Sequence, residues 1–72
     1  MDIIADILSV AMEETKKTQI VYKANLNFRR VEGYLHYLLD RGLIENTDGG
    51  YKTTEKGKEF LSDYQKMKRL LM

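Results

Sequence analysis

The 72-residue chain has no cysteine, no proline and no tryptophan, and these absences exclude several kinds of site. Without cysteine there can be no disulfide framework, no thiolate zinc site and no thiol chemistry. The single histidine, His36, argues against a metal site, and no cofactor is expected. Long apolar runs are also missing, since the unbroken ones span two or three residues and a bilayer requires roughly 20. We therefore expect a cytoplasmic protein.

Small size is the second constraint. Hydrophobic residues make up 43% of the chain and charged residues 32%, a balance typical of globular proteins. Below roughly 70–80 residues a single core rarely contributes more than about 3–5 kcal/mol to the free energy of unfolding. Small folds are therefore usually stabilised further by disulfides, a bound metal ion or oligomerisation. Because disulfides and metal are excluded or unexpected, we expect residues 1–72 to form one domain that assembles as a homodimer.

Charge is unevenly distributed, although the formal net charge is only +1. Residues 1–15 contain four acidic side chains and no basic one, whereas residues 16–30 contain five basic side chains and no acidic one. A helix macrodipole favours acidic residues at its start and basic ones at its end. This accounts for Asp2, Asp6, Lys16 and Lys17 but not for Arg29 and Arg30.

Two helices are predicted in the N-terminal third. Apolar residues recur there with the 3.6-residue helical period. The residues on this face are Ile3, Ile4, Ile7, Leu8 and Ala11. They predict a first helix over about 2–14, followed by a polar break at 15–17. Thr18 is the predicted N-cap of a short second helix that contains Ile20, Val21 and Ala24.

A tight turn and a longer third helix follow. Asn25 can adopt the left-handed conformation that ends a helix, Leu26 can point inward, and Asn27 is a strong N-cap. The third helix is predicted from about residue 28 to residue 41, with Gly42 just past its end. Its predicted core face consists of Phe28, Val31, Leu35, Leu38 and Leu39.

After Gly42 the period changes to two. Leu43–Asn46 and Tyr51–Thr53 are predicted strands, and the Asp-Gly step between them is a strong hairpin signal. Thr54 is a possible N-cap for a last helix over about 55–72.

This order predicts a mainly α fold with a small β-hairpin. Two helices joined by a tight turn, the second one longer, form a helix-turn-helix, and the following hairpin makes it winged. In a winged helix-turn-helix the third helix enters the major groove of double-stranded DNA, and the hairpin can reach adjacent backbone.

The side of the third helix opposite its apolar face begins with Arg29 and Arg30. Arginine pairs bidentately with guanine or clamps phosphate. Gly33 would let the helix backbone approach the groove floor; the alternatives are a tolerated surface glycine or one that admits another helix. Tyr37 can donate to phosphate or pack against a neighbour, and His36 is expected as a surface histidine.

Lysines flank this motif. Phosphate contact and simple solvation are the alternatives for the three lysines that precede the third helix, which are Lys16, Lys17 and Lys23. Lys52 is the one cation of the hairpin, and Asp48 lies at its tip. The wing is therefore short and not clearly basic, which weakens the case for a minor-groove contact.

Three segments carry recognisable motifs: IVYKANLNF at 20–28, the stretch from Tyr34 to Glu45, and YKTTEKGKEFL at 51–61. Together they resemble archaeal winged-helix predicted transcriptional regulators over nearly the whole chain. The A-N-L turn and the T-E-K-G-x-x-F-L entry to the last helix are the most telling pieces. The resemblance implies DNA binding, often as a dimer through an extended C-terminal helix. The residues that it places toward DNA are Asn27, Arg29, Arg30, Gly33 and His36 or Tyr37.

The predicted last helix carries an apolar seam with coiled-coil spacing. Its members, Phe60, Tyr64, Met67 and Leu71, are separated by four, three and four residues. We expect the first turns to pack on the chain's own first helix, through Phe60, Leu61 and Tyr64. The remaining apolar residues lie further out and predict a symmetric dimer, whose expected interface is Phe60, Tyr64, Met67, Leu70 and Leu71.

The predicted function is sequence-selective or architectural binding of double-stranded DNA, most simply as a transcription regulator that is associated with the nucleoid. The alternative is a winged-helix module that contacts protein and not DNA, favoured by the near-neutral charge, by Asp40 on the exposed face and by the weakly basic wing. An enzyme is not expected, because there is no Gly-rich phosphate loop and neither Ser9 nor Ser62 has a nearby base in sequence. No small-molecule ligand is evident.

Overall fold

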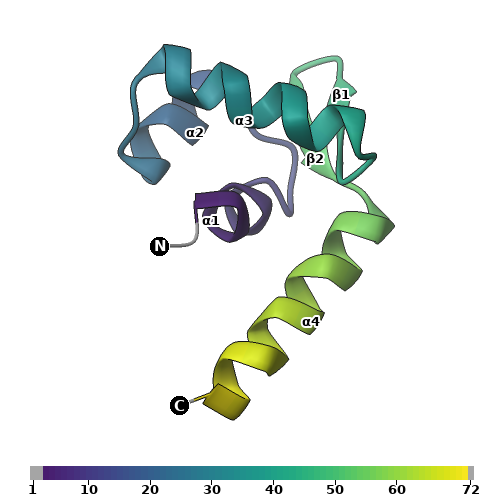
Figure 1. Ribbon diagram of the computed structural model, residues 1–72. Coiled ribbons are helices and arrows are strands. Elements are labelled where there is room, and N and C mark those ends of the chain that lie inside the picture. Colours follow the sequence, from purple (N-terminus) through teal and green to yellow (C-terminus); the bar gives the residue numbers. More distant parts are fainter. Residues whose placement is uncertain (1–2, 72) are drawn as a thin grey trace.

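The computed structural model describes residues 3–71, which form four helices and one hairpin. The elements are α1 (Ile3–Val10), α2 (Lys17–Ala24), α3 (Phe28–Asp40), β1 (Ile44–Thr47), β2 (Gly50–Thr53) and α4 (Glu55–Leu71). Figure 1 shows α1 between α3 on one side and α4 on the other, with the hairpin joining α3 to α4. The predicted winged helix-turn-helix order is confirmed.

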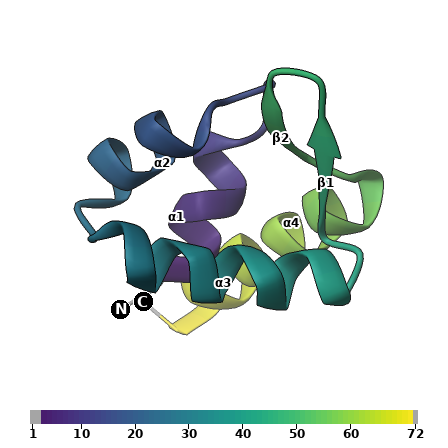
Figure 2. The ribbon, with the colours of Figure 1, turned by 90° about the horizontal axis from the view of Figure 1, so that it is seen from above.

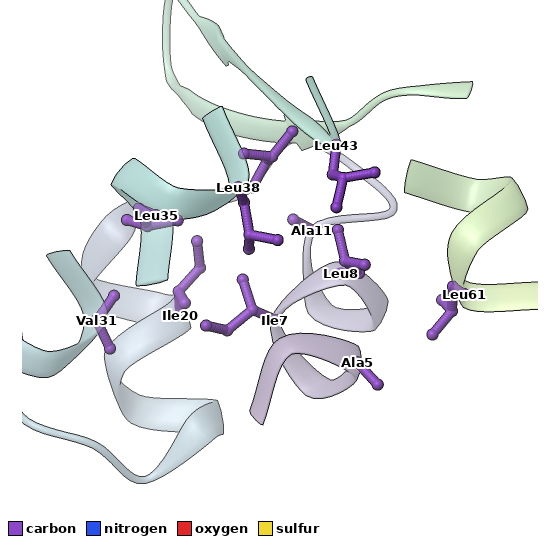
Figure 3. Packing of buried hydrophobic residues seen from close by; sticks show 11 residues of the cluster. Ala5, Ile7, Leu8, Ala11, Ile20, Val31, Leu35, Leu38, Leu43 and Leu61 are labelled. Atoms are coloured by element: carbon purple, nitrogen blue, oxygen red, sulfur yellow. The ribbon is translucent and has the colours of Figure 1, made fainter. Parts of the chain in front are cut away.

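The core forms where α1, α2 and α3 meet. Figure 3 shows Ile7 of α1 directed toward Ile20 of α2 and Leu38 of α3. These three residues and Leu8 of α1 are fully buried. The other buried hydrophobic residues are Ala5, Ala11, Val31, Leu35, Leu43, Ile44 and Leu61. Fully burying side chains of this size stabilises the fold by about 1.5–3 kcal/mol each. The amphipathic pattern of the first and third helices therefore predicted most of the core.

Local backbone signals end α2 and begin α3 as predicted. Asn25 adopts the left-handed conformation (φ 57°, ψ 44°), which ends α2. The Oδ1 atom of Asn27 accepts a hydrogen bond of 2.8 Å from the backbone N–H of Arg30, which satisfies one of the unpaired donors at the start of α3. The turn of the helix-turn-helix is thus held by two asparagines.

A second pair of local signals ends α3 and begins α4. Gly42 has a φ of 73°, in the left-handed region that favours glycine, just past the Arg41 C-cap. The hydroxyl of Thr54 accepts from the N–H of Gly57 at 3.0 Å and donates to the carbonyl of Gly42 at 2.7 Å. Thr54 is therefore the predicted N-cap, and it also ties the start of α4 to the end of α3.

The hairpin pairs with the segment that joins α1 to α2. Within the hairpin, Ile44 lies opposite Thr53 and Thr47 lies opposite Gly50. Thr15 forms an antiparallel bridge with Tyr51 through two backbone hydrogen bonds of 2.9 Å. A Cβ on Gly50 would overlap the carbonyl oxygen of Thr15, so this close approach requires glycine. Residues 15–17 were predicted as a polar break, but Thr15 is in fact buried and paired.

The predicted end of the first helix, Glu14, is wrong. The helix ends at Val10, because β2 takes over the hydrogen bonding of its last turn. The carbonyl of Ala11 accepts from the Thr53 N–H, and the carbonyl of Leu8 accepts from the Thr53 hydroxyl, both at 2.8 Å. These bonds direct the chain away from the helix axis.

Three smaller predictions also differ from the structure. The N-cap of α2 is Lys16 and not Thr18, and its side chain makes no capping hydrogen bond. β1 begins and ends one residue later than predicted, at Ile44 and Thr47, whereas β2 begins one residue earlier, at Gly50, and ends at Thr53 as predicted. Phe28 was predicted in the core but is 51% exposed. It lies at the edge of the buried face of α3, in the first turn, where the short turn before it leaves the ring partly in solvent.

Close packing around Gly57 explains why the T-E-K-G motif ends in glycine, and it provides a test of the fold. A Cβ at this position would overlap the carbonyl oxygen of Leu43 and lie 2.6 Å from Cγ2 of Thr53. We expect Gly57→Ala to lower the free energy of unfolding by about 1–3 kcal/mol, because backbone atoms cannot yield easily. Urea unfolding monitored by circular dichroism measures the change.

Gly33→Ala is the matched control for Gly57→Ala. Gly33 is also inside a helix, but a Cβ there meets no atom within 4 Å. Alanine should therefore raise stability by up to about 1 kcal/mol, through helix propensity alone. Equal effects of the two substitutions would contradict the packing role of Gly57.

Candidate nucleic-acid interface

The start of α3 presents the two predicted arginines to solvent. Val31, Leu35 and Leu38 bury one face of α3, and this orientation leaves Arg29 and Arg30 exposed on its first turn. Asn27 contributes indirectly, because its Oδ1 atom is engaged with the N–H of Arg30. Its role in the structure is to fix where the helix begins, and hence the direction in which the arginines point.

The structure brings four of the predicted residues together around one shallow hollow. Arg29, Arg30, Gly33 and Tyr37 line it, with Ile4 of α1 and Tyr34, and its volume is about 340 Å³. The hollow is therefore an apolar surface to which two arginine side chains contribute.

Gly33 lies at this surface without a packing reason. No described atom lies within 4 Å of the place a Cβ would occupy, so no other helix among residues 3–71 requires the glycine. A glycine inside a helix costs about 1 kcal/mol relative to alanine. The remaining alternatives are a tolerated surface glycine and a close approach by something outside the chain.

Tyr37 and His36 lie on different flanks of α3. The guanidinium of Arg41 stacks over the ring of Tyr37, 4.5 Å from its centroid, so this tyrosine packs against a neighbour while staying partly exposed. His36 is exposed as predicted and borders a separate hollow together with Lys17 and Glu32. The two residues therefore cannot serve one contact point.

The three lysines before α3 have different surroundings. The Nζ atom of Lys17 lies 3.2 Å from Oε1 of Glu32, an ion pair that connects α2 to α3. An exposed ion pair contributes little to stability, so its main effect is on the placement of the two side chains. Lys16 and Lys23 are exposed.

The wing contains Lys52, one of the predicted DNA-contacting residues, and it lies at a distance from the two arginines. Figure 2 shows the hairpin beside the C-terminal half of α3, whereas Arg29 and Arg30 lie at its N-terminal end. Lys52 is exposed, and its charge lies close enough to Glu14 to influence that carboxylate.

Glu14 connects the α1–α2 segment to the wing, and sequence analysis missed this role. Its Oε2 atom accepts from the N–H of Gly49 at 3.3 Å. The pKa of Glu14 is lowered, because its neighbours favour the charged carboxylate. The largest effect comes from the Thr47 hydroxyl, followed by the Gly49 N–H, and the charge of Lys52 adds to both. Thr47 Oγ1 is buried and makes no hydrogen bond of ordinary geometry within the described chain, so its effect on Glu14 is one of proximity. No local sequence signal marks a contact between residues 35 positions apart.

No helix within 3–71 is long and apolar enough to cross a membrane. Nor do His, Asp and Glu side chains in that range gather into a group of three or more that could hold a metal ion.

A family model described as a winged helix-turn-helix matches residues 1–72. The chain belongs to this winged helix-turn-helix family. A solved structure supports the same fold: the crystal structure of Sso10a-2, a DNA-binding protein from Sulfolobus solfataricus, superposes with a TM-score of 0.75. It is 27% identical in sequence, and the match covers 97% of this chain and 81% of Sso10a-2.

Two archaeal relatives are closer in sequence. Uncharacterized protein MJ0290 of Methanocaldococcus jannaschii is 43% identical over 70 residues, and uncharacterized protein MJ0287 of the same organism is 36% identical over 62 residues. The matches cover 96% and 85% of this chain, but only 33% of MJ0290 and 64% of MJ0287. The predicted resemblance to an archaeal winged-helix family is therefore confirmed.

The lowered pKa of Glu14 predicts a pH-dependent attachment of the wing. Folding favours the carboxylate, so this stabilisation is present above the ordinary pKa of 4.5 and is lost as pH falls through the lower folded value. We expect Glu14→Gln to lower the melting temperature at pH 7. The difference from the unsubstituted protein should shrink as the pH decreases below 4.5.

Glu13→Gln is the matched control, since it removes an exposed neighbouring carboxylate. It should leave the backbone N–H chemical shift of Gly49 unchanged, whereas Glu14→Gln should move it. If the Gly49 N–H chemical shift is the same in Glu14→Gln as in the unsubstituted protein, the contact between Glu14 and Gly49 does not form in solution.

Proposed function

We propose that this winged helix-turn-helix binds double-stranded DNA, with α3 in the major groove, and regulates transcription. The observation that carries the proposal is the exposed pair Arg29 and Arg30 on the first turn of α3. In helix-turn-helix proteins the N-terminal residues of this helix contact base edges. Membership of the family and the DNA-binding description of Sso10a-2 support the same function.

Apart from Asn27, which caps α3, the predicted contact residues each have a role in this arrangement. Arg29 and Arg30 pair with guanine or with phosphate, and exposed Lys16 and Lys23 neutralise backbone phosphates. Gly33 lets the backbone of α3 approach the groove floor, which accounts for a glycine without a packing partner. The residues assigned to more peripheral contacts are Lys17, His36, Tyr37 and Lys52.

A homodimer through α4 completes the proposal. Leu70 and Leu71 are 86% and 82% exposed, and Met67 is also exposed. Figure 1 shows the last turns of α4 extending away from α2 and α3. Leu61 is buried and Tyr64 partly buried against the core, as expected, but Phe60 stays 43% exposed at the edge of a hollow that Ile4 also lines. Pairing α4 with a second copy would bury this seam and present two α3 helices to two half-sites roughly 34–36 Å apart or a multiple of that.

Removing both arginines tests the assignment of α3. We expect Arg29→Ala with Arg30→Ala to weaken binding to a duplex by at least about 30-fold, because each bidentate contact discriminates by about 1–3 kcal/mol and two are removed. If both contact phosphate, the slope of log K against log salt should become less negative by about 2. Fluorescence anisotropy on a labelled duplex at several salt concentrations measures both quantities.

The control replaces two exposed basic residues of α4, Lys66 and Arg69, by alanine. This variant has the same net charge as the arginine variant and should keep most of the affinity. If both double variants lose affinity equally, net charge and not α3 determines binding. Absence of binding to any duplex at low salt would instead favour the protein-interaction module.

The proposed dimer is tested by polar substitution of the seam. The unsubstituted protein should sediment at twice 8.4 kDa at micromolar concentration. Met67→Ser with Leu71→Ser should give a monomer that keeps its helical content, because both side chains are exposed in the single chain. Sedimentation equilibrium and circular dichroism provide the two readings.

Tyr22→Ser is the control, since Tyr22 is 85% exposed on α2, away from the seam. It should leave the mass unchanged. A monomer for the unsubstituted protein at micromolar concentration would refute the dimer and leave the DNA-binding proposal to be judged separately.

A further inference from the structure

Phe28 has no role in the core. Its ring is 51% exposed at the first position of α3, although sequence periodicity placed it on the buried face. It is also not part of the seam on α4. About half of this large apolar residue is therefore left in solvent in the free chain.

Phe28 lies where the buried face of α3, represented here by Val31, meets polar residues of the first turn. It follows the capping residue Asn27 and precedes Arg29 and Arg30, and all three of these residues are exposed. Residues four apart share one face of a helix, so Phe28 lies on the same side of α3 as Glu32, which pairs with Lys17 of α2. Phe28 is therefore on the same side of α3 as the ion pair with α2, and it is next in sequence to the two arginines.

We propose that Phe28 determines specificity by contacting the 5-methyl group of a pyrimidine, foremost thymine, in the major groove. The inference rests on the proposed DNA binding. Among the major-groove edges, the thymine methyl is the feature that an apolar side chain reads, and phenylalanine is one of the residues that does so. The N-terminal residues of the recognition helix are the ones that reach base edges.

This assignment divides recognition between adjacent residues. Arg29 and Arg30 can only donate hydrogen bonds, which suits guanine and phosphate. Phe28 can only offer apolar surface, which suits the methyl group. The preferred site would therefore place an A·T pair beside a G·C pair, in contact with the first turn of α3.

The test compares duplex pools that differ only in the methyl group. Random 20-base-pair pools are synthesised with either thymidine or deoxyuridine, and each competes with a labelled duplex for the protein in an anisotropy assay. Burying one methyl group is worth about 0.8 kcal/mol, which corresponds to a preference of about fourfold for the thymidine pool. A third pool combines deoxyuridine with 5-methylcytosine. If this pool recovers the affinity, any pyrimidine methyl suffices; if it does not, the contact is specific to thymine.

Variants of Phe28 assign the preference to this ring. Phe28→Ala should bind the two pools equally, whereas Phe28→Leu should keep part of the preference because it still offers apolar surface. Tyr22→Ala removes another exposed aromatic ring and should leave the preference intact. Because Phe28 is half exposed, we expect all three variants to fold, and circular dichroism checks this.

The outcomes separate this inference from the proposed function. Equal affinity of the unsubstituted protein for the thymidine and deoxyuridine pools would overturn the role of Phe28 while leaving DNA binding intact. A preference that persists in Phe28→Ala would also overturn it. Failure to bind any pool at low salt would refute the proposed function itself.

Discussion

The hydrogen bonds from Thr53 to the end of α1 are the constraint on which the rest of the molecule depends. Every helix leaves its last carbonyls without partners inside the helix. Here the backbone N–H and the hydroxyl of Thr53 satisfy the carbonyls of Ala11 and Leu8. The chain leaves α1 at that point, and Thr15 then pairs with Tyr51. The wing is thereby attached to the segment that leads into α2, so hairpin and helix-turn-helix form one unit.

This constraint also explains which parts of the fold the sequence could predict. The signals at Asn25, Asn27, Gly42 and Thr54 act on backbone atoms a few residues away, and all four were confirmed. The end of α1 depends on a strand far along the chain, and local pattern alone extended the helix too far. Local signals therefore predicted the elements and the other helix ends near them, whereas the end of α1 follows from its tertiary partner Thr53.

The candidate interface shows the same division. Helical phase correctly placed Arg29 and Arg30 in solvent, because the buried residues of α3 fix the orientation of the whole helix. Helical phase wrongly placed Phe28 in the core. A helical wheel takes no account of where a helix begins or of how much neighbouring structure covers its first turn. Glu14 was missed because its partner Gly49 lies in the turn of the wing, 35 residues further along the chain. What a residue does at this surface depends on its neighbours in space as much as on its type.

The charge distribution and the small size of the chain have a common consequence. The five basic residues of 16–30 lie on and around α2 and the start of α3, whereas Glu14 offsets Lys52 at the wing. Each phosphate that a basic side chain neutralises releases counterions, so affinity grows with the number of contacts. One protomer offers few of them. A second protomer would double that number without adding charge to either chain, and covering the exposed end of α4 would add apolar burial that a core of this size lacks. The same pairing would thus raise both the stability of the fold and its affinity for DNA.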